Sequence, residues 1–242
     1  MLKAPPLAAH FAGSLRDCRS GVAFLEFAFA LPVVLALGLL GLETANYAMA
    51  NLRVSNVAML TADNASRVRD SIDEGDIVEL FTGAKMSGSN INFAQNGRII
   101  LTDLEQHSGG TLQWVRWQRC DGALNYAATP TALRPMTSGG TVISNGTEVY
   151  NSDRTTNSSA PSSEAKASLT SVGSGSNVIS AQAGTAVMVV EVAYNYQPVI
   201  PNSFLTGRRI TYVSAFNVRQ RNDQTLRNIN RITPKSCNTF AA

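Results

Sequence analysis

The stretch VAFLEFAFALPVVLALGLLGL, from Val22 to Leu42, decides the fold of this chain. Its 21 residues include one charged side chain, that of Glu26. As an α-helix, a run of this length is about 30 Å long, which matches the hydrocarbon thickness of a bilayer. The sequence therefore predicts a membrane-spanning helix over residues 22–42.

The charges that flank this run indicate its orientation. Three basic residues precede it, whereas Glu43 follows it directly and the next cation is Arg53. Basic residues tend to stay on the cytoplasmic side of a membrane. Residues 1–21 are therefore expected inside the cell, and everything after the helix is expected outside.

Glu26 separates two interpretations of this segment. An ordinary secretory signal peptide has a shorter apolar stretch, no carboxylate inside it and a small-x-small cleavage site at its far end. A charge in a spanning helix costs about 2.5 kcal/mol or more at the bilayer centre and less near the interface, so by default it indicates a function. A plain N-terminal anchor, in which Glu26 lines a helix contact, is the alternative.

The position of Glu26 points to a processing site, because it is the fifth residue after Gly21 and is followed by Phe27. This GxxxxE arrangement, with a basic residue upstream, resembles the processing site of type IV prepilins, in which a membrane peptidase cuts after the glycine. The resemblance implies a leader at 1–21, a mature chain that begins at Val22, and pairing of the Glu26 carboxylate with the new amine of a neighbouring subunit. Glycine leaves the bond unobstructed, and pairing removes the cost of burying either charge alone.

A wider resemblance covers about a third of the chain. Residues 21–58, GVAFLEFAFALPVVLALGLLGLETANYAMANLRVSNVA, are similar to the opening of TadE-like proteins, minor pseudopilins of the tight adherence (Tad, or Flp) pilus system. WVRWQRC at 114–120, AYNYQPVIPNSF at 193–204 and ITYVSAFNVRQR at 210–221 also resemble that family. Residues at about 130–180 show no such likeness.

The resemblance implies a bacterial minor pseudopilin that helps to assemble an adhesive pilus and is not an enzyme. The expected partners are the inner membrane, the prepilin peptidase, other pilins and pseudopilins, and the pilus assembly machinery. The main domain would lie in the periplasm, with roles in cell adhesion, biofilm formation and secretion. Pro32 fits assembly and plain anchoring alike, since spanning helices tolerate a kink when neighbours satisfy the freed carbonyl. The rival interpretation is a single-pass envelope binding protein or adhesin with an uncut anchor.

Beyond the membrane, the pattern predicts a pilin-like α+β fold in which the long helix packs on an antiparallel sheet. Apolar and small residues recur at steps of three and four, which indicates an amphipathic extension of the helix over 43–70. The polar residues at 71–76 are interpreted as a helix end and loop. The exported domain is expected at 71–242, with a Ser/Gly/Thr-rich excursion at about 130–184 and a possible hairpin at 141–150.

Four segments carry the β-branched and aromatic residues of strands, namely 98–104, 111–119, 185–196 and 209–220. The last alternates most clearly, with its apolar residues on one face, as a half-buried antiparallel strand requires. These apolar residues are Ile210, Tyr212, Phe216 and Val218.

The tryptophans and arginines of 111–119 do not form one binding platform. Alternation places Trp117 and Arg119 on one face of the strand, and Trp114 and Arg116 on the other. A cation-π strip for glycan or nucleic acid is therefore less favoured than core packing with outward arginines.

The three cysteines allow a disulfide in the exported part. Cys120 and Cys237 follow the apolar run and can pair in an oxidising compartment, while Cys18 precedes it and stays reduced or is cut away. A metal site is the less favoured alternative, because only His107 lies nearby. No metal and no cofactor are expected.

Charge and motifs give little support to other functions. Outside the basic residues before the helix and Asp17, the chain has 17 basic and 16 acidic residues, so there is no electrostatic case for nucleic acid. A hydrolase that uses His107 with Ser108 or Cys120 and Asp103 is conceivable. The sequence has no nucleophile elbow, zinc-protease or phosphate-loop motif to support it.

Overall fold

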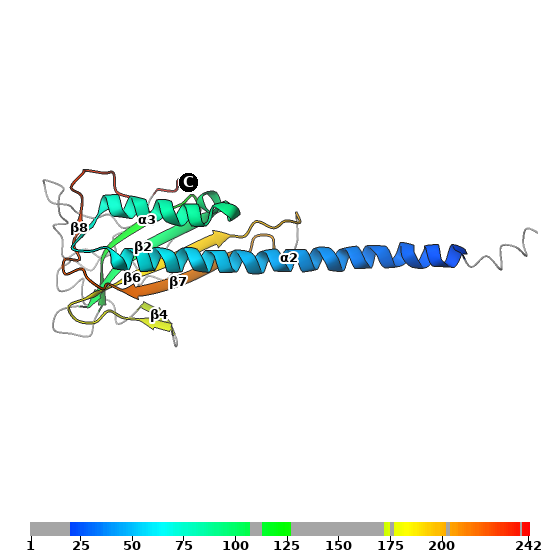
Figure 1. The fold of residues 1–242 in the computed structure, drawn as a ribbon, viewed down its shortest axis with the longest axis horizontal. Helices are drawn as coiled ribbons and strands as arrows, with labels where there is room; N and C mark the ends of the chain where they lie inside the picture. Colours follow the sequence, from blue (N-terminus) through cyan, green and yellow to red (C-terminus); the bar gives the residue numbers. More distant parts are fainter. Residues whose placement is uncertain (1–19, 107–112, 127–171, 175–176, 202–203, 238) are drawn as a thin grey trace, which may run out of the picture.

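The computed structural model describes residues 20–106, 113–126, 172–174, 177–201, 204–237 and 239–242. A long helix leads into an α+β domain (Figure 1). The helices are α2 (Ser20–Arg67), α3 (Glu74–Ser87), the 3-10 turn η1 (Ser89–Ile91) and α4 (Phe93–Asn96). The strands are β1 (Ile72–Asp73), β2 (Gly97–Gln106), β3 (Gln113–Asp121), β4 (Val172–Ser174), β5 (Asn177–Ile179), β6 (Ala186–Asn195), β7 (Arg209–Asn217) and β8 (Leu226–Arg227).

Helix α2 has two halves that differ in burial. Every residue from Gly21 to Leu42 is exposed, and this half projects from the domain in Figure 1. Burial begins at Glu43, and the second half packs on β6 and β7. The helix continues through Pro32 and ends at Arg67, close to the predicted end. Among the described residues, this is the one helix long and apolar enough to cross a membrane.

The main sheet has the order β3-β2-β6-β7, and all its neighbouring strands are antiparallel. Helices α2 and α3 cover one face of this sheet, where the largest group of buried apolar side chains lies. The predicted fold class, a long helix packed on an antiparallel sheet, is therefore confirmed. The four strands also coincide with the four predicted segments to within a few residues.

The prediction of a loop at 71–76 is wrong from Glu74 onward, because helix α3 begins there, and Ile72 and Asp73 form the short strand β1. Asp73 accepts a hydrogen bond from the Gly75 amide at 2.9 Å, and the Asp76 carboxylate accepts one from the Asp73 amide at 2.9 Å. This reciprocal capping box satisfies amides that the first helical turn leaves free. The polar cluster therefore belongs to the start of α3, whereas α2 already ends at Arg67.

Two side-chain placements also differ from prediction. Tyr212 is 41% exposed, because β7 is the edge strand and α2 covers only part of it. Arg119 is fully buried and does not point outward. Trp117 pairs with Asp103 of β2 and lies in the core under the helices. The predicted burial of Trp117 is confirmed.

Several predictions lie outside the described residues. These are the leader up to residue 19, His107, Ser108 and the hairpin at 141–150. The C-terminal part of the predicted excursion is described, and there β4 and β5 form a small antiparallel pair.

Candidate functional site

The predicted processing and assembly residues lie on the exposed half of α2. Gly21, Val22, Glu26 and Phe27 occupy its first two turns, and each is exposed to solvent. A Cβ added at Gly21 would meet no atom within 4 Å. Packing within the chain therefore does not require glycine at this position, and the apolar surface around Glu26 is left for a membrane or another molecule.

Glu43 is the first buried residue of α2 from Gly21 onward, and it links this helix to the rest of the domain. Its carboxylate accepts hydrogen bonds from the Tyr196 hydroxyl at 2.9 Å and from the amides of Val199 and Ile200 at 3.1 and 3.0 Å. The side chain is fully buried. These three donors replace water around the carboxylate and fix the helix against the segment that follows β6.

Aromatic side chains complete this junction. The rings of Tyr47 and Tyr196 meet edge to face with centroids 5.0 Å apart, and Asn46 donates to the Tyr196 hydroxyl at 2.7 Å. Burial raises the pKa of Tyr196, and the hydrogen bond to Glu43 acts in the same direction. The hydroxyl therefore stays protonated and able to donate at physiological pH. This role of Glu43 was not predicted from the sequence, although its position as a carboxylate directly after an apolar run could have indicated it.

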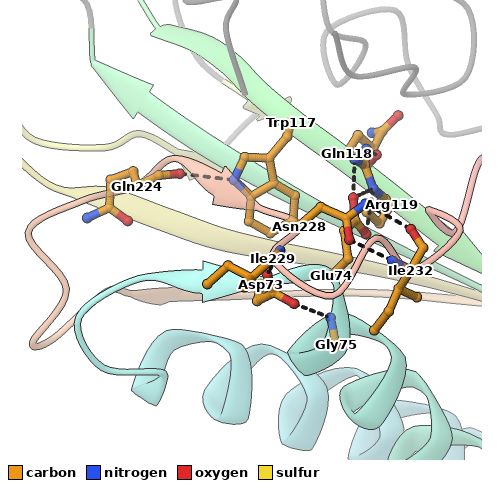
Figure 2. Close-up of polar contacts among 10 residues, drawn as sticks. All are labelled: Asp73, Glu74, Gly75, Trp117, Gln118, Arg119, Gln224, Asn228, Ile229 and Ile232. Carbon is orange, nitrogen blue, oxygen red and sulfur yellow. Dashed lines mark hydrogen bonds and ion pairs between the residues drawn. The ribbon is translucent and has the colours of Figure 1, made fainter. Parts of the chain in front are cut away.

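A second polar cluster lies beside the start of α3 (Figure 2). The Arg119 Nε atom donates to both carboxylate oxygens of Glu74, at 2.8 and 3.1 Å, and both side chains are completely buried. Burial raises the pKa of Glu74, and the Arg119 guanidinium opposes that rise. The pair joins the first turn of α3 to β3, the edge strand farthest from β7 in the sheet order.

The C-terminal segment is tied to the same cluster. The Trp117 indole donates to the Gln224 carbonyl at 3.2 Å, and the Ile229 amide donates to the Asp73 carboxylate at 2.9 Å (Figure 2). The N-cap residue of α3 and a side chain of β3 thus also hold the chain beyond β7.

A disulfide joins Cys120 of β3 to Cys237, which lies 117 positions further along the sequence, and the two Cα atoms are 4.7 Å apart. Beside it, the buried Arg98 guanidinium donates to the carbonyls of Gly122, Cys237 and Thr239 at 2.8, 2.8 and 2.6 Å. Burial lowers the pKa of Arg98 to about 10, which leaves it charged at neutral pH. The C-terminal segment is therefore held by a covalent bond and by an arginine.

We expect loss of this bridge to destabilise the domain. Replacing both Cys120 and Cys237 by alanine should lower the free energy of unfolding by about 2–5 kcal/mol, because the unfolded chain gains freedom over a long loop. Urea unfolding of the detergent-solubilised protein measures the loss, and the nonreducing intact mass shows whether the bond is present. Cys18→Ala, made like the double variant in a host without a prepilin peptidase so that residues 1–21 are kept, is the matched control and should leave the unfolding midpoint unchanged.

The described residues offer little for catalysis. They contain no group of three or more His, Cys, Asp or Glu side chains placed to hold a metal ion. Cys120 is in the disulfide, and Asp103 is buried 4.0 Å from the Arg221 guanidinium. A groove of about 320 Å³ lies between α2 and α3, lined by Leu60, Asp76, Glu79 and their neighbours. The conceivable triad is thus left without Cys120 as its nucleophile.

Taken together, the fold and the junction define a class of protein, an α+β domain carried on one apolar helix that is compatible with single-pass membrane anchoring. The sequence model of one family, described as TadE-like protein, matches residues 21–63. The resemblance to TadE-like proteins is thereby confirmed over the apolar helix and its exit. No curated protein and no solved structure gives a significant match.

Proposed function

We propose that this chain is a minor pseudopilin that takes part in assembling a Tad (Flp) adhesive pilus. The observation that carries the proposal is the exposed apolar half of α2. This half begins at Gly21, contains Glu26 and lies within residues 21–63, which the TadE-like family model matches. A soluble domain would not leave 22 consecutive helical residues exposed, because apolar surface of this size is normally covered by lipid or protein. Both coverings are available to a pilin subunit, first in the membrane and then in the filament.

The proposed maturation has one covalent step. A prepilin peptidase hydrolyses the bond between Gly21 and Val22, which releases residues 1–21 and leaves an α-amine on Val22. The mature chain then consists of a spanning helix over 22–42, its extension and an exported domain from about residue 71. The domain would lie in the periplasm until assembly.

Glu26 is the proposed assembly residue. Its exposed carboxylate lies about one helical turn from the new amine, on a side of the chain open to a neighbour. Pairing with the Val22 amine of an adjacent subunit would neutralise both charges in an apolar environment. An added Cβ atom at Gly38 or Gly41 would meet nothing within 4 Å. These two positions therefore leave room for the helix of a neighbouring subunit to approach closely.

Intact mass tests the processing step. We expect the protein from membranes of a host with the cognate prepilin peptidase to be lighter by the mass of residues 1–21 than the protein from a host that lacks it. A Gly21→Leu variant should keep its full mass in both hosts, because a side chain at this position obstructs the scissile bond. An unchanged mass in both hosts would favour an uncut anchor on an envelope binding protein.

A further inference from the structure

Among the residues of the domain that the structure describes, those between β6 and β7, at 196–201 and 204–208, reach furthest along α2 toward its N-terminus (Figure 1). Glu43 holds this connection through the amides of Val199 and Ile200. Because Glu43 directly follows Leu42, the backbone at 199–200 lies beside the end of the exposed apolar run. The connection is therefore held at one position along the axis of α2, next to Leu42.

This position lies at the surface of the membrane if residues 22–42 span the membrane. The 22 exposed residues from Gly21 to Leu42 form about 33 Å of helix, against roughly 30 Å of hydrocarbon. The helix thus leaves the hydrocarbon close to Leu42, and the headgroup layer begins there. Tyr47, which is partly exposed at this junction, is of the residue type enriched at membrane interfaces.

The side chains of the connection fit a lipid surface. Val199 and Phe204 are 57% and 61% exposed, although both are large and apolar. Arg208 and Arg209 are exposed on the return toward β7. Arg209 also donates to the Asn195 side chain at 3.1 Å and lies over the Tyr126 ring at 5.3 Å. Apolar side chains next to cations are the combination that binds the boundary between acyl chains and phosphate headgroups.

We propose that this connection is a second membrane contact, in which Val199 and Phe204 enter the headgroup layer and Arg208 lies against lipid phosphates. The inference rests on the proposed function, because it requires residues 22–42 to span. With two contacts and the rigid Glu43 junction, the domain is held in one orientation before assembly. The end that carries Asp73 and Arg119 then points away from the membrane.

Tryptophan quenching by brominated acyl chains tests this contact. The full chain is reconstituted at low protein-to-lipid ratio into phosphatidylcholine vesicles that contain brominated lipid, as Phe204→Trp. Ile229→Trp is the matched control, because Ile229 is 60% exposed and binds Asp73 beyond the far end of α2. Phe29→Trp, within the span, reports insertion of the helix. Trp114 and Trp117 give the same background in every variant, which the unsubstituted chain measures.

We expect strong quenching of the Phe29→Trp variant, at least about twofold more quenching of Phe204→Trp than of Ile229→Trp, and a blue-shifted emission for Phe204→Trp. If Phe29→Trp is quenched while Phe204→Trp matches Ile229→Trp, the second contact is wrong and the spanning helix stands. If Phe29→Trp is not quenched either, the span itself is wrong, and the second contact falls with it. Nonreducing mass confirms that each variant keeps the disulfide.

Discussion

Replacing Glu26 by alanine should abolish incorporation of this protein into assembled pili while leaving its domain folded. The substitution removes the carboxylate that is proposed to compensate the Val22 amine of a neighbour. An unpaired charge within the hydrocarbon costs about 2.5–3.5 kcal/mol, which corresponds to a loss on the order of 100-fold in the assembly equilibrium. Quantitative immunoblotting of sheared pili against the membrane fraction measures this loss.

Two further substitutions separate charge from shape at this position. Glu26→Gln keeps the size and hydrogen-bonding capacity of the side chain but not its charge, and we expect the same defect as for alanine. Glu26→Asp keeps the charge and should restore most of the incorporation. Wild-type incorporation of the glutamine variant would contradict charge pairing, and wild-type function of the alanine variant would favour a plain anchor.

Replacing Glu74 by alanine should cause a large loss of folding stability in the domain. It leaves the Arg119 guanidinium completely buried without the carboxylate that it contacts at 2.8 and 3.1 Å. Removal of one partner from a buried ion pair costs about 3–5 kcal/mol, because the remaining charge is desolvated without compensation. Chemical unfolding in detergent, followed by circular dichroism, measures this cost.

Arg67→Ala is the control for Glu74→Ala. Arg67 pairs with Asp63 at 2.7 Å, but its side chain is 60% exposed, so water screens the interaction. Exposed pairs of this kind contribute about 0–1 kcal/mol. Equal effects of the two substitutions would show that water reaches the Glu74 pair.

The sequence determined the parts of this protein that depend on local pattern. An apolar run interrupted only by Glu26 predicts the long helix whatever the rest of the chain does, because its length alone matches a bilayer. Period-two alternation and β-branched residues located the four strands of the main sheet. The start of α3 was also encoded by local sequence, since Asp73 and Asp76 have the spacing of a capping box. The polarity of these residues was instead interpreted as a loop.

The candidate processing site was likewise visible in the sequence, because Gly21 and Glu26 are recognised by their spacing and by the apolar run that follows. The junction was not visible. Glu43 could be noticed as the residue after that run, but its partner Tyr196 is 153 residues away in sequence. No local pattern indicates which hydroxyl a carboxylate will meet.

Only the tertiary structure decided which charged residues are buried. Arg119 was expected to point outward, because an arginine on a strand usually extends into water. The sheet instead places it under α3, where Glu74 supplies a carboxylate from 45 residues away. A burial of this kind depends on two distant segments meeting, since either charge alone would be too costly to desolvate. The apolar helix was thus determined by composition, and the way the domain is held against it was determined by long-range contacts.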